Sequence, residues 1–352
     1  MATEEPKKVT LDWLPNEILL KIFTYLDSKD VCLAVANVCE RWNYLTRDVT
    51  LWKNLNLLCN KNMSIDYLIF VIPKMPLLKS IKLQWRTDVH LICQQLCRNC
   101  EDIRQLELVC CGQVKESCIR LLADHFPNLE VFSLGKCWSI EPNCFNLICK
   151  FSHLRKLNVS HSRCIAGPLL REIADSCYFL QHINLDYVRG LSDDDIIYVL
   201  ESKKNNLLSL VLYGECLTDI TYCYLEKCSM LRILHLSSCL LMTDKGLRSI
   251  TKLNSLKSFK LRLGTNLSTE AISNFLLSDM ASKLEYLILS RLQGMNDLAT
   301  LNISTNCINV RYLEVVYCPN VTDQSREYLV AGCKQLKVLH FRQNCPYRYT
   351  QC

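Results

Sequence analysis

Hydrophobic residues recur at fixed positions along most of the chain. From about residue 78 to the end, their order is Leu-x-x-Leu-x-Leu, with Ile, Val or Phe as substitutes. The last position of this pattern is occupied eleven times, by Leu83, Leu108, Leu134, Val159, Leu185, Leu212, Leu236, Leu261, Leu289, Val315 and Phe341. Successive members lie 24 to 28 residues apart. Because side chains alternate between the two faces of a strand, each Leu-x-Leu unit predicts a short strand with both leucines facing a core.

The remainder of each repeat has helical spacing, as in the pair Ile119 and Leu122 or the pair Leu170 and Ile173. Four of these segments follow a residue suited to an N-cap, namely Ser192, Thr218, Thr243 and Thr322. A strand and a helix within each period of this length are typical of leucine-rich repeats. The predicted fold class is therefore α/β, with a horseshoe-shaped leucine-rich-repeat solenoid over residues 78–344. About eleven parallel strands are expected on the concave face, with the helices outside.

Cysteine is frequent in this chain, with 23 residues. Nine cysteines keep the register of the repeat, five before the first hydrophobic position and four after the last: Cys100, Cys177, Cys228, Cys307, Cys333, Cys111, Cys137, Cys239 and Cys318. A free cysteine behaves as a small hydrophobic residue, so these are expected to be buried at the corners of each coil. They resemble the cysteine-containing subclass of leucine-rich repeats. A zinc site at Cys93, Cys97 and Cys100 is a weaker alternative, because no second CxxC or nearby His pair matches it.

The first fifty residues lack the repeat and predict a small helical unit. Five apolar residues at helical spacing form one face of an amphipathic helix, namely Ile18, Leu19, Ile22, Phe23 and Leu26. Pro15 is suited to the first position of this helix, where its missing N–H costs nothing. A second helix is predicted to start near residues 28–30, and a third to carry Val38, Trp42 and Leu45.

This helical unit closely resembles the F-box. Its signature positions are occupied by Leu14, Pro15, Glu17, Ile18, Leu19, Ile22, Phe23, Tyr25, Leu26, Asp30, Val38, Cys39, Trp42, Leu51 and Trp52. An F-box followed by cysteine-containing leucine-rich repeats is the arrangement of the F-box/leucine-rich-repeat (FBXL) family, the substrate receptors of SCF ubiquitin ligases. The two resemblances together cover roughly residues 12–344.

The resemblance implies that the F-box docks on the Skp-type adaptor of an SCF complex, which bridges to a cullin and a RING subunit. The residues expected to bind the adaptor are Leu14, Pro15, Glu17, Ile18, Ile22, Val38 and Trp42. The alternative is that the three helices only cap the solenoid, because each repeat buries its face against a neighbour. Leu19, Phe23 and Leu26 suit either role, whereas Leu14 and Pro15, at the exposed start of the helix, favour the interface.

The repeats are expected to supply a second binding surface, for a protein substrate, on the concave face. The middle and flanking strand positions there are mixed in charge and rich in aromatic residues, and Tyr, Trp and Arg dominate protein–protein hot spots. The expected substrate-binding residues are Trp85, Glu107, Asn158, Asn184, Tyr187, Tyr213, His235, Lys260, Arg262, Tyr286, Tyr312 and Glu314. The alternative is that these exposed strand positions vary freely and bind nothing.

Other classes of function are disfavoured. The formal net charge of +6 is small for 352 residues and argues against a nucleic-acid partner. Apolar runs fall short of the roughly 18 residues that a membrane span needs. Gly-rich phosphate loops, HExxH and GxSxG are absent, so no catalytic residue, metal or cofactor is predicted. The acidic run Asp193, Asp194 and Asp195 falls at a predicted helix start, where carboxylates complement the helix dipole.

The sequence thus predicts a non-catalytic substrate-recognition subunit of an SCF-type E3 ubiquitin ligase. The alternative is a leucine-rich-repeat binding scaffold without a ubiquitin role. The predicted segments are a tail at 1–11, the F-box at 12–56, a helical linker or N-terminal cap at 57–77, the repeats at 78–344 and a C-terminal tail at 345–352. Because the first residues lack the apolar core of a signal peptide, a cytoplasmic or nuclear location is expected. The chain after Phe341, with Tyr347, Arg348 and Tyr349, is expected to cover the open end of the solenoid or to line its binding surface.

Overall fold

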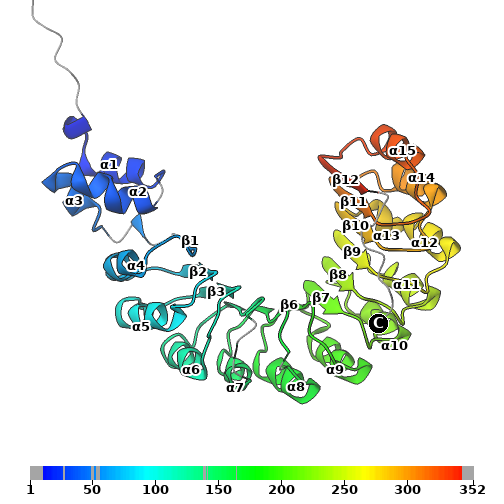
Figure 1. The fold of residues 1–352 in the computed structure, drawn as a ribbon, viewed down its shortest axis with the longest axis horizontal. Helices are drawn as coiled ribbons and strands as arrows, with labels where there is room; N and C mark the ends of the chain where they lie inside the picture. Colours follow the sequence, from blue (N-terminus) through cyan, green and yellow to red (C-terminus); the bar gives the residue numbers. More distant parts are fainter. Residues whose placement is uncertain are drawn as a thin grey trace, which may run out of the picture.

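The chain forms an open horseshoe with strands on its inner side and helices on its outer side (Figure 1). This computed structural model describes residues 11–26, 28–48, 51–52, 56–137, 140, 142–163 and 165–342. The predicted tail at 345–352, with the contacts expected of it, lies outside the described residues, as does the predicted N-terminal tail up to residue 10. The predicted fold class, three N-terminal helices followed by a leucine-rich-repeat solenoid, is confirmed.

Twelve strands form a single sheet in which neighbouring strands are parallel and follow the order of the sequence. They are β1 (Asn56–Cys59), β2 (Ser80–Gln84), β3 (Gln105–Val109), β4 (Val131–Ser133), β5 (Lys156–Asn158), β6 (His182–Leu185), β7 (Ser209–Tyr213), β8 (Ile233–Ser237), β9 (Ser258–Arg262), β10 (Tyr286–Ser290), β11 (Tyr312–Val316) and β12 (Val338–Arg342). In β9, Phe259 and Leu261 are buried in the core, whereas Ser258, Lys260 and Arg262 remain partly exposed. This alternation places the polar strand residues on the concave face.

Helices cover the outside of the horseshoe (Figure 1). They are α4 (Ile65–Val71), α5 (Val89–Asn99), α6 (Glu116–His125), α7 (Asn143–Asn146), α8 (Gly167–Ser176), α9 (Asp193–Lys203), α10 (Asp219–Tyr224), α11 (Asp244–Ile250), α12 (Thr269–Leu276), α13 (Asp279–Ser282), α14 (Asp297–Asn306) and α15 (Gln324–Gly332). Short 3-10 segments continue three of them, namely η4 (Ile72–Lys74) after α4, η5 (Leu147–Lys150) after α7 and η6 (Leu225–Lys227) after α10. The predicted caps Ser192, Thr218 and Thr243 are confirmed at α9, α10 and α11. The prediction for Thr322 is wrong, because α15 begins after Asp323, which stands at the N-cap without a side-chain hydrogen bond.

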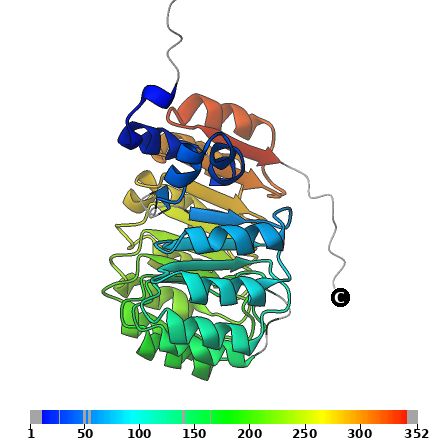
Figure 2. The ribbon, with the colours of Figure 1, turned by 90° about the vertical axis from the view of Figure 1, so that its left-hand side faces the viewer.

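The N-terminal helices stack on the first end of the solenoid (Figure 2). They are η1 (Leu11–Trp13), α1 (Asn16–Phe23), α2 (Ser28–Leu33), η2 (Val35–Asn37) and α3 (Glu40–Leu45). Trp52 is buried, and its indole N–H donates to the carbonyl oxygen of Thr46 at 3.2 Å, which ties the chain after α3 back to the helices. Buried side chains from Leu19 to Cys333 form one continuous cluster. The N-terminal helices and the repeats therefore share a single hydrophobic core.

The same backbone turn follows nearly every strand. A non-glycine residue with positive φ stands two positions after the last hydrophobic position of the repeat, at Trp85, Cys110, Lys136, His161, Tyr187, Ser238, Leu263, Arg291 and Tyr317. The cysteine after several of these turns is buried, and its thiol reaches the carbonyl oxygen of the preceding strand: Cys111 lies 3.4 Å from that of Leu83, and Cys137 lies 3.5 Å from that of Leu108. All nine cysteines that keep the register are buried, as predicted.

The structure corrects three details of the predicted elements. The sheet has twelve strands rather than eleven, because β1 pairs with β2 inside the region predicted to be F-box and linker. This strand was not predicted, because Cys59 stands opposite Leu83, at a position where the repeat pattern has leucine. Val38 lies in the turn before α3 rather than within it, and Pro15 precedes the first helical residue as its N-cap.

Candidate functional site

Helix α1 presents two apolar stripes, of which only one is buried. Leu19 and Phe23 are 0 % and 2 % exposed and belong to the core. Ile18 and Ile22, each one position earlier, are 44 % and 38 % exposed. A helix that only caps a core needs one apolar face. Ile18 and Ile22 therefore form a second apolar stripe that is not buried within the chain, as expected for a surface that binds a partner.

The start of α1 is held in place by α3. The Arg41 guanidinium donates from Nη2 to the carbonyl oxygen of Leu14 at 2.6 Å and to Oδ1 of Asn16 at 2.8 Å. Leu14 is half-buried as a result, whereas Pro15 and Glu17 are exposed. Charge-assisted hydrogen bonds of this kind are the stronger ones, so the exposed helix start has a defined orientation.

Val38 and Trp42, the last two predicted adaptor-binding residues, have different surroundings. Val38 is exposed in the turn before α3. Trp42 is half-buried, and its ring meets that of Phe23 edge-on with 5.2 Å between centroids. Its indole N–H is buried without a hydrogen-bond partner in the structure. Trp42 thus joins α1 to α3 through packing, while Val38 extends the exposed apolar surface.

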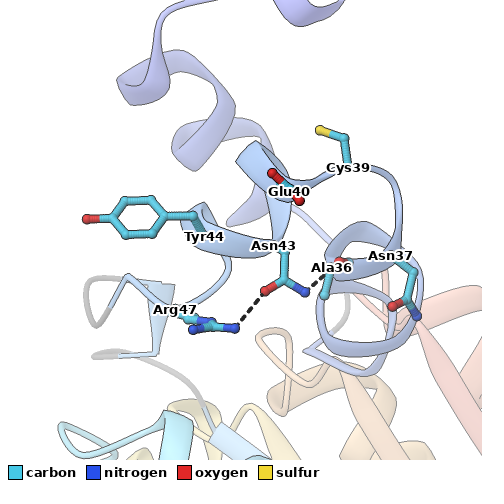
Figure 3. Close-up of a pocket in the computed structure, with 7 residues that line it drawn as sticks. All are labelled: Ala36, Asn37, Cys39, Glu40, Asn43, Tyr44 and Arg47. Atoms are coloured by element: carbon cyan, nitrogen blue, oxygen red, sulfur yellow. Dashed lines mark hydrogen bonds between the residues drawn. The ribbon is translucent and has the colours of Figure 1, made fainter.

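A cavity of about 520 Å³ opens between η2 and α3, beside Val38 (Figure 3). It is lined by Ala36, Asn37, Cys39, Glu40, Asn43, Tyr44 and Arg47. The amide of Asn43 donates to the carbonyl oxygen of Ala36 at 2.8 Å and accepts from Arg47 Nη2 at 3.0 Å. Sequence reasoning did not select this cavity, because most of its lining residues are polar and therefore do not belong to the hydrophobic pattern.

All twelve predicted substrate-binding residues lie on or beside the strands and are at least partly exposed. Glu107, Asn158, Asn184, His235, Lys260 and Glu314 occupy strand positions between two buried residues or at the end of a short strand. Tyr213 and Arg262 end their strands, Tyr286 and Tyr312 begin theirs, and Trp85 and Tyr187 sit in the left-handed turns. The structure thus brings them to one continuous face, although their binding role stays a prediction.

Aromatic rings on this face are stacked across neighbouring strands in two groups. The Tyr187 ring lies 4.4 Å from that of His161 and 5.0 Å from that of Tyr213, centroid to centroid. In the second group the rings of Tyr286 and Tyr312 are 4.4 Å apart and nearly parallel. Stacking fixes the rings before any partner arrives, which lowers the entropy lost on binding.

Charged side chains on this face are partly paired. Arg262 Nη2 lies 3.7 Å from Glu314 Oε1, and Lys82 Nζ lies 3.2 Å from Glu107 Oε2. Burial, with a smaller contribution from the charge of Lys260, lowers the pKa of His235 to about 4. His235 is therefore neutral near pH 7, and its Nε2 lies 2.9 Å from the Ser258 hydroxyl.

The acidic run at the start of α9 is occupied by structural hydrogen bonds. Asp195 forms a capping box with Ser192 and an ion pair of 2.7 Å with Arg171. Asp193 accepts hydrogen bonds from the backbone N–H and the hydroxyl of Thr218. Within the described ranges, no group of three or more His, Cys, Asp or Glu residues is arranged to hold a metal ion. Nor does any helix of the described chain combine the length and apolar character needed to cross a membrane.

Comparison with known proteins yields matches both for the N-terminal helices and for the repeats. A family model described as F-box-like matches residues 11–58. F-box/LRR-repeat protein 4 of Bos taurus is 24 % identical over 253 residues, covering 70 % of this chain and 37 % of that protein. These two matches support an F-box/leucine-rich-repeat protein. F-box/LRR-repeat protein 5 of Danio rerio is 41 % identical over 49 residues, which are 14 % of this chain and 7 % of that protein.

A third relative of this chain has a name that describes an enzyme. Lysine-specific demethylase 2B of Mus musculus is 21 % identical over 330 residues, covering 90 % of this chain but only 19 % of that protein. The chain thus spans much less than two thirds of the length of each of these relatives. At the level of the family, F-box/leucine-rich-repeat proteins are generally non-catalytic adaptors.

The fold also resembles a chain in the crystal structure of the Rad7 and Elc1 complex of yeast. The TM-score is 0.64, with 19 % identical residues, 92 % of this chain covered and 87 % of that chain. At this identity the likeness concerns the fold. It extends over nearly the whole chain, so the joined arrangement of N-terminal helices and solenoid recurs there.

Proposed function

We propose that this chain is the substrate-recognition subunit of an SCF-type E3 ubiquitin ligase. Its F-box binds the Skp-type adaptor, through which a cullin and a RING subunit are recruited. Its repeats bind a protein substrate on the concave face. A cytoplasmic or nuclear location belongs to the same proposal.

The second apolar stripe of α1 carries this proposal. Ile18 and Ile22 are exposed although the core already has Leu19 and Phe23. Burying an aliphatic side chain of this size is worth about 1.5–3 kcal/mol, so a partner that covers both residues gains appreciable binding energy. The stripe lies within the F-box-like match at residues 11–58, whose family-level role is adaptor binding.

The shared core supports the second half of the proposal. Because buried side chains are continuous from Leu19 to Cys333, the F-box and the concave face hold one orientation relative to each other. A substrate bound to the repeats would then be presented at a fixed place near a ubiquitin-loaded enzyme. Such positioning accelerates a reaction by raising the effective concentration of the reacting groups. In this role the chain itself makes and breaks no covalent bond.

The known structure of the Rad7 and Elc1 complex also supports the proposal. There, a chain similar in fold over most of its length belongs to a complex of two proteins. A chain of this fold is thus compatible with a bound second protein. The runner-up, a repeat scaffold whose helices only cap the solenoid, is the outcome that the following experiment separates.

The test is a pull-down of the full chain with a Skp-type adaptor and a cullin, beside the double variant Ile18→Glu, Ile22→Glu. Both side chains are exposed, so the variant is expected to fold, which circular dichroism checks. The matched control is Ile220→Glu, which places the same charge at an exposed isoleucine of α10. We expect the parent and the control to retain the adaptor and the double variant to lose it. A well-folded parent that retains no adaptor would leave the scaffold function.

A further inference from the structure

The second half of the concave face is rich in cations. Strands β8 to β12 contain Lys260, Arg262 and Arg342, and Arg291 follows β10 directly. Glu314 is the one acidic residue of these five strands. A cation-rich surface of this kind attracts anionic partners and disfavours cationic ones.

Glu314 is already neutralised by neighbours on the same face. Its carboxylate lies 3.7 Å from Nη2 of Arg262, two strands away, and 3.5 Å from the Tyr312 hydroxyl. The Arg262 Nε also donates to the Ser290 hydroxyl at 3.2 Å, which holds the guanidinium over β10. The side chain of Glu314 is only 16 % exposed. The carboxylate therefore offers little charge to an incoming ligand, and the surface presented is positive.

Lys260 is a partly buried cation of this surface that forms no ion pair among the described residues. No carboxylate of the described residues lies within ion-pair distance of its Nζ, and the side chain is half-buried in the middle of β9. Burial, followed by the charge of Arg262, lowers the pKa of Lys260, against the opposite influence of Asp186 and Glu314. An anion placed at this ammonium would restore the stabilisation that water no longer supplies.

Aromatic rings line the same strands. Tyr286 and Tyr312 stack at 4.4 Å, His235 approaches Tyr286 at 5.9 Å, and His340 approaches Tyr312 at 5.6 Å. A cavity of about 500 Å³ adjoins them and is lined by Arg262, Tyr312, Glu314, Val316, Tyr317, Leu339, His340, Phe341 and Arg342. Cations beside fixed aromatic rings suit a peptide that combines carboxylates with apolar side chains.

We propose that the concave face from β8 to β12 binds an acidic peptide segment of the substrate, with a carboxylate at Lys260 and apolar side chains against the rings of Tyr286 and Tyr312. This proposal rests on the proposed function, because the peptide counts as a substrate only if the chain is a ligase subunit. The earlier strands lack the same combination. β2 to β6 carry two lysines and one glutamate but no tyrosine, and Lys82 there is paired with Glu107.

Lys82 offers a matched control for Lys260. Each is the third residue of a five-residue strand and lies between two buried residues. Replacement of either by glutamine removes one charge from the concave face without adding volume. Only Lys260 belongs to the half that contains the stacked rings of Tyr286 and Tyr312.

The experiment selects peptides from a random-sequence phage library on the purified full chain. We expect the selected peptides to be enriched in Asp and Glu together with aromatic or aliphatic residues. Fluorescence anisotropy with one labelled selected peptide then compares Lys260→Gln with Lys82→Gln. Loss of a half-buried charge contact is expected to weaken binding about tenfold for Lys260→Gln and less than about twofold for Lys82→Gln.

Several outcomes would overturn the proposal. They are a selection that returns no binders or only neutral or basic peptides, an equal loss in the two lysine variants, and displacement of the peptide by single-stranded RNA at lower concentration. The adaptor pull-down is repeated with Lys260→Gln. Loss of peptide binding with the adaptor retained concerns this proposal alone, whereas a parent that binds acidic peptides but no adaptor contradicts only the ligase function.

Discussion

Asp297, the first residue of α14, accepts two hydrogen bonds from Thr322 of the next repeat. The backbone N–H of Thr322 donates to Oδ1 at 2.8 Å, and its hydroxyl donates to Oδ2 at 2.7 Å. The same relation joins the first residues of three earlier helices to the repeats that follow them. Those pairs are Asp193 with Thr218, Asp219 with Thr243, and Asp244 with Ser268. One carboxylate thus satisfies donors of the adjacent repeat, which helps to fix the stacking of repeats.

Replacing Asp297 by Asn is expected to destabilise the protein. The amide keeps one acceptor oxygen but loses the charge and the second acceptor, while the donors of Thr322 and Ser325 remain. Leaving a donor without its charged acceptor costs about 1–3 kcal/mol. The measurement is the urea midpoint by circular dichroism. Asp323→Asn is the control, since Asp323 is exposed and its side chain caps no helix; an equal shift for both variants would contradict the prediction.

The same carboxylate predicts a pH dependence of stability. Burial raises the pKa of Asp297, but hydrogen bonds from Ser325 and Thr322 outweigh it and hold the pKa below its ordinary value. A carboxyl whose folded pKa is depressed stabilises the fold above its unfolded pKa of about 4 and loses this contribution as pH falls through the folded pKa. We therefore expect the stability difference between the parent and Asp297→Asn to shrink as pH falls below about 4. Urea midpoints of both proteins at a series of pH values measure this difference. A difference that stays constant down to about pH 2 would contradict the lowered pKa of Asp297.

Lys136 is expected to be strained by its backbone conformation. Its φ is +59° in the turn after β4, and its side chain is exposed. The left-handed conformation costs a residue with a Cβ about 1–2 kcal/mol, which glycine avoids at some cost in entropy. Lys136→Gly is therefore expected to stabilise the protein by about 0.5–1 kcal/mol, measured as a higher melting temperature. Lys136→Ala keeps the Cβ and serves as the control, and an equal gain in both variants would point to the charge instead.

Cysteine reactivity should separate corner residues from surface residues. All twenty cysteines that the structure describes are free thiols, and of these Cys39 and Cys216 are exposed. Burial raises the pKa of Cys239 and of Cys307 to about 12, so neither forms the reactive thiolate near pH 7. Brief alkylation followed by peptide mass spectrometry should label Cys39 and Cys216 and spare Cys239 and Cys307 until urea is added. Labelling of Cys239 in the native protein as fast as that of Cys216 would refute the burial of the corners.

The solenoid could be predicted because its information is local and periodic. Each strand repeats one short pattern, and the register of that pattern also located the buried cysteines. β1 was missed because Cys59 stands where the pattern has leucine. The cap at Thr322 was mispredicted because the next residue, Asp323, already has helical backbone angles and precedes the first residue of α15. The exact first residue of a helix depends on backbone angles that the hydrophobic pattern does not specify.

The candidate sites could be predicted less completely. The concave positions followed from strand alternation, and all twelve are partly exposed. The pairing of Arg262 with Glu314 spans two strands and could not be read from either repeat alone. The cavity between η2 and α3 has no hydrophobic signal, because mostly polar side chains of both segments create it.

By itself, the sequence determined the class of fold, the number of repeats to within one, and the place of a helical unit resembling an F-box. Those features depend on hydrophobic spacing along the chain, which is the same whether the chain is folded or not. Only the tertiary structure decided how the apolar residues of α1 divide between the core and the surface. Ile18 and Leu19 are adjacent and both aliphatic, yet one is exposed and the other is buried. The reason is that burial depends on which neighbours pack against each side of the helix, and α3 packs against the side of Phe23.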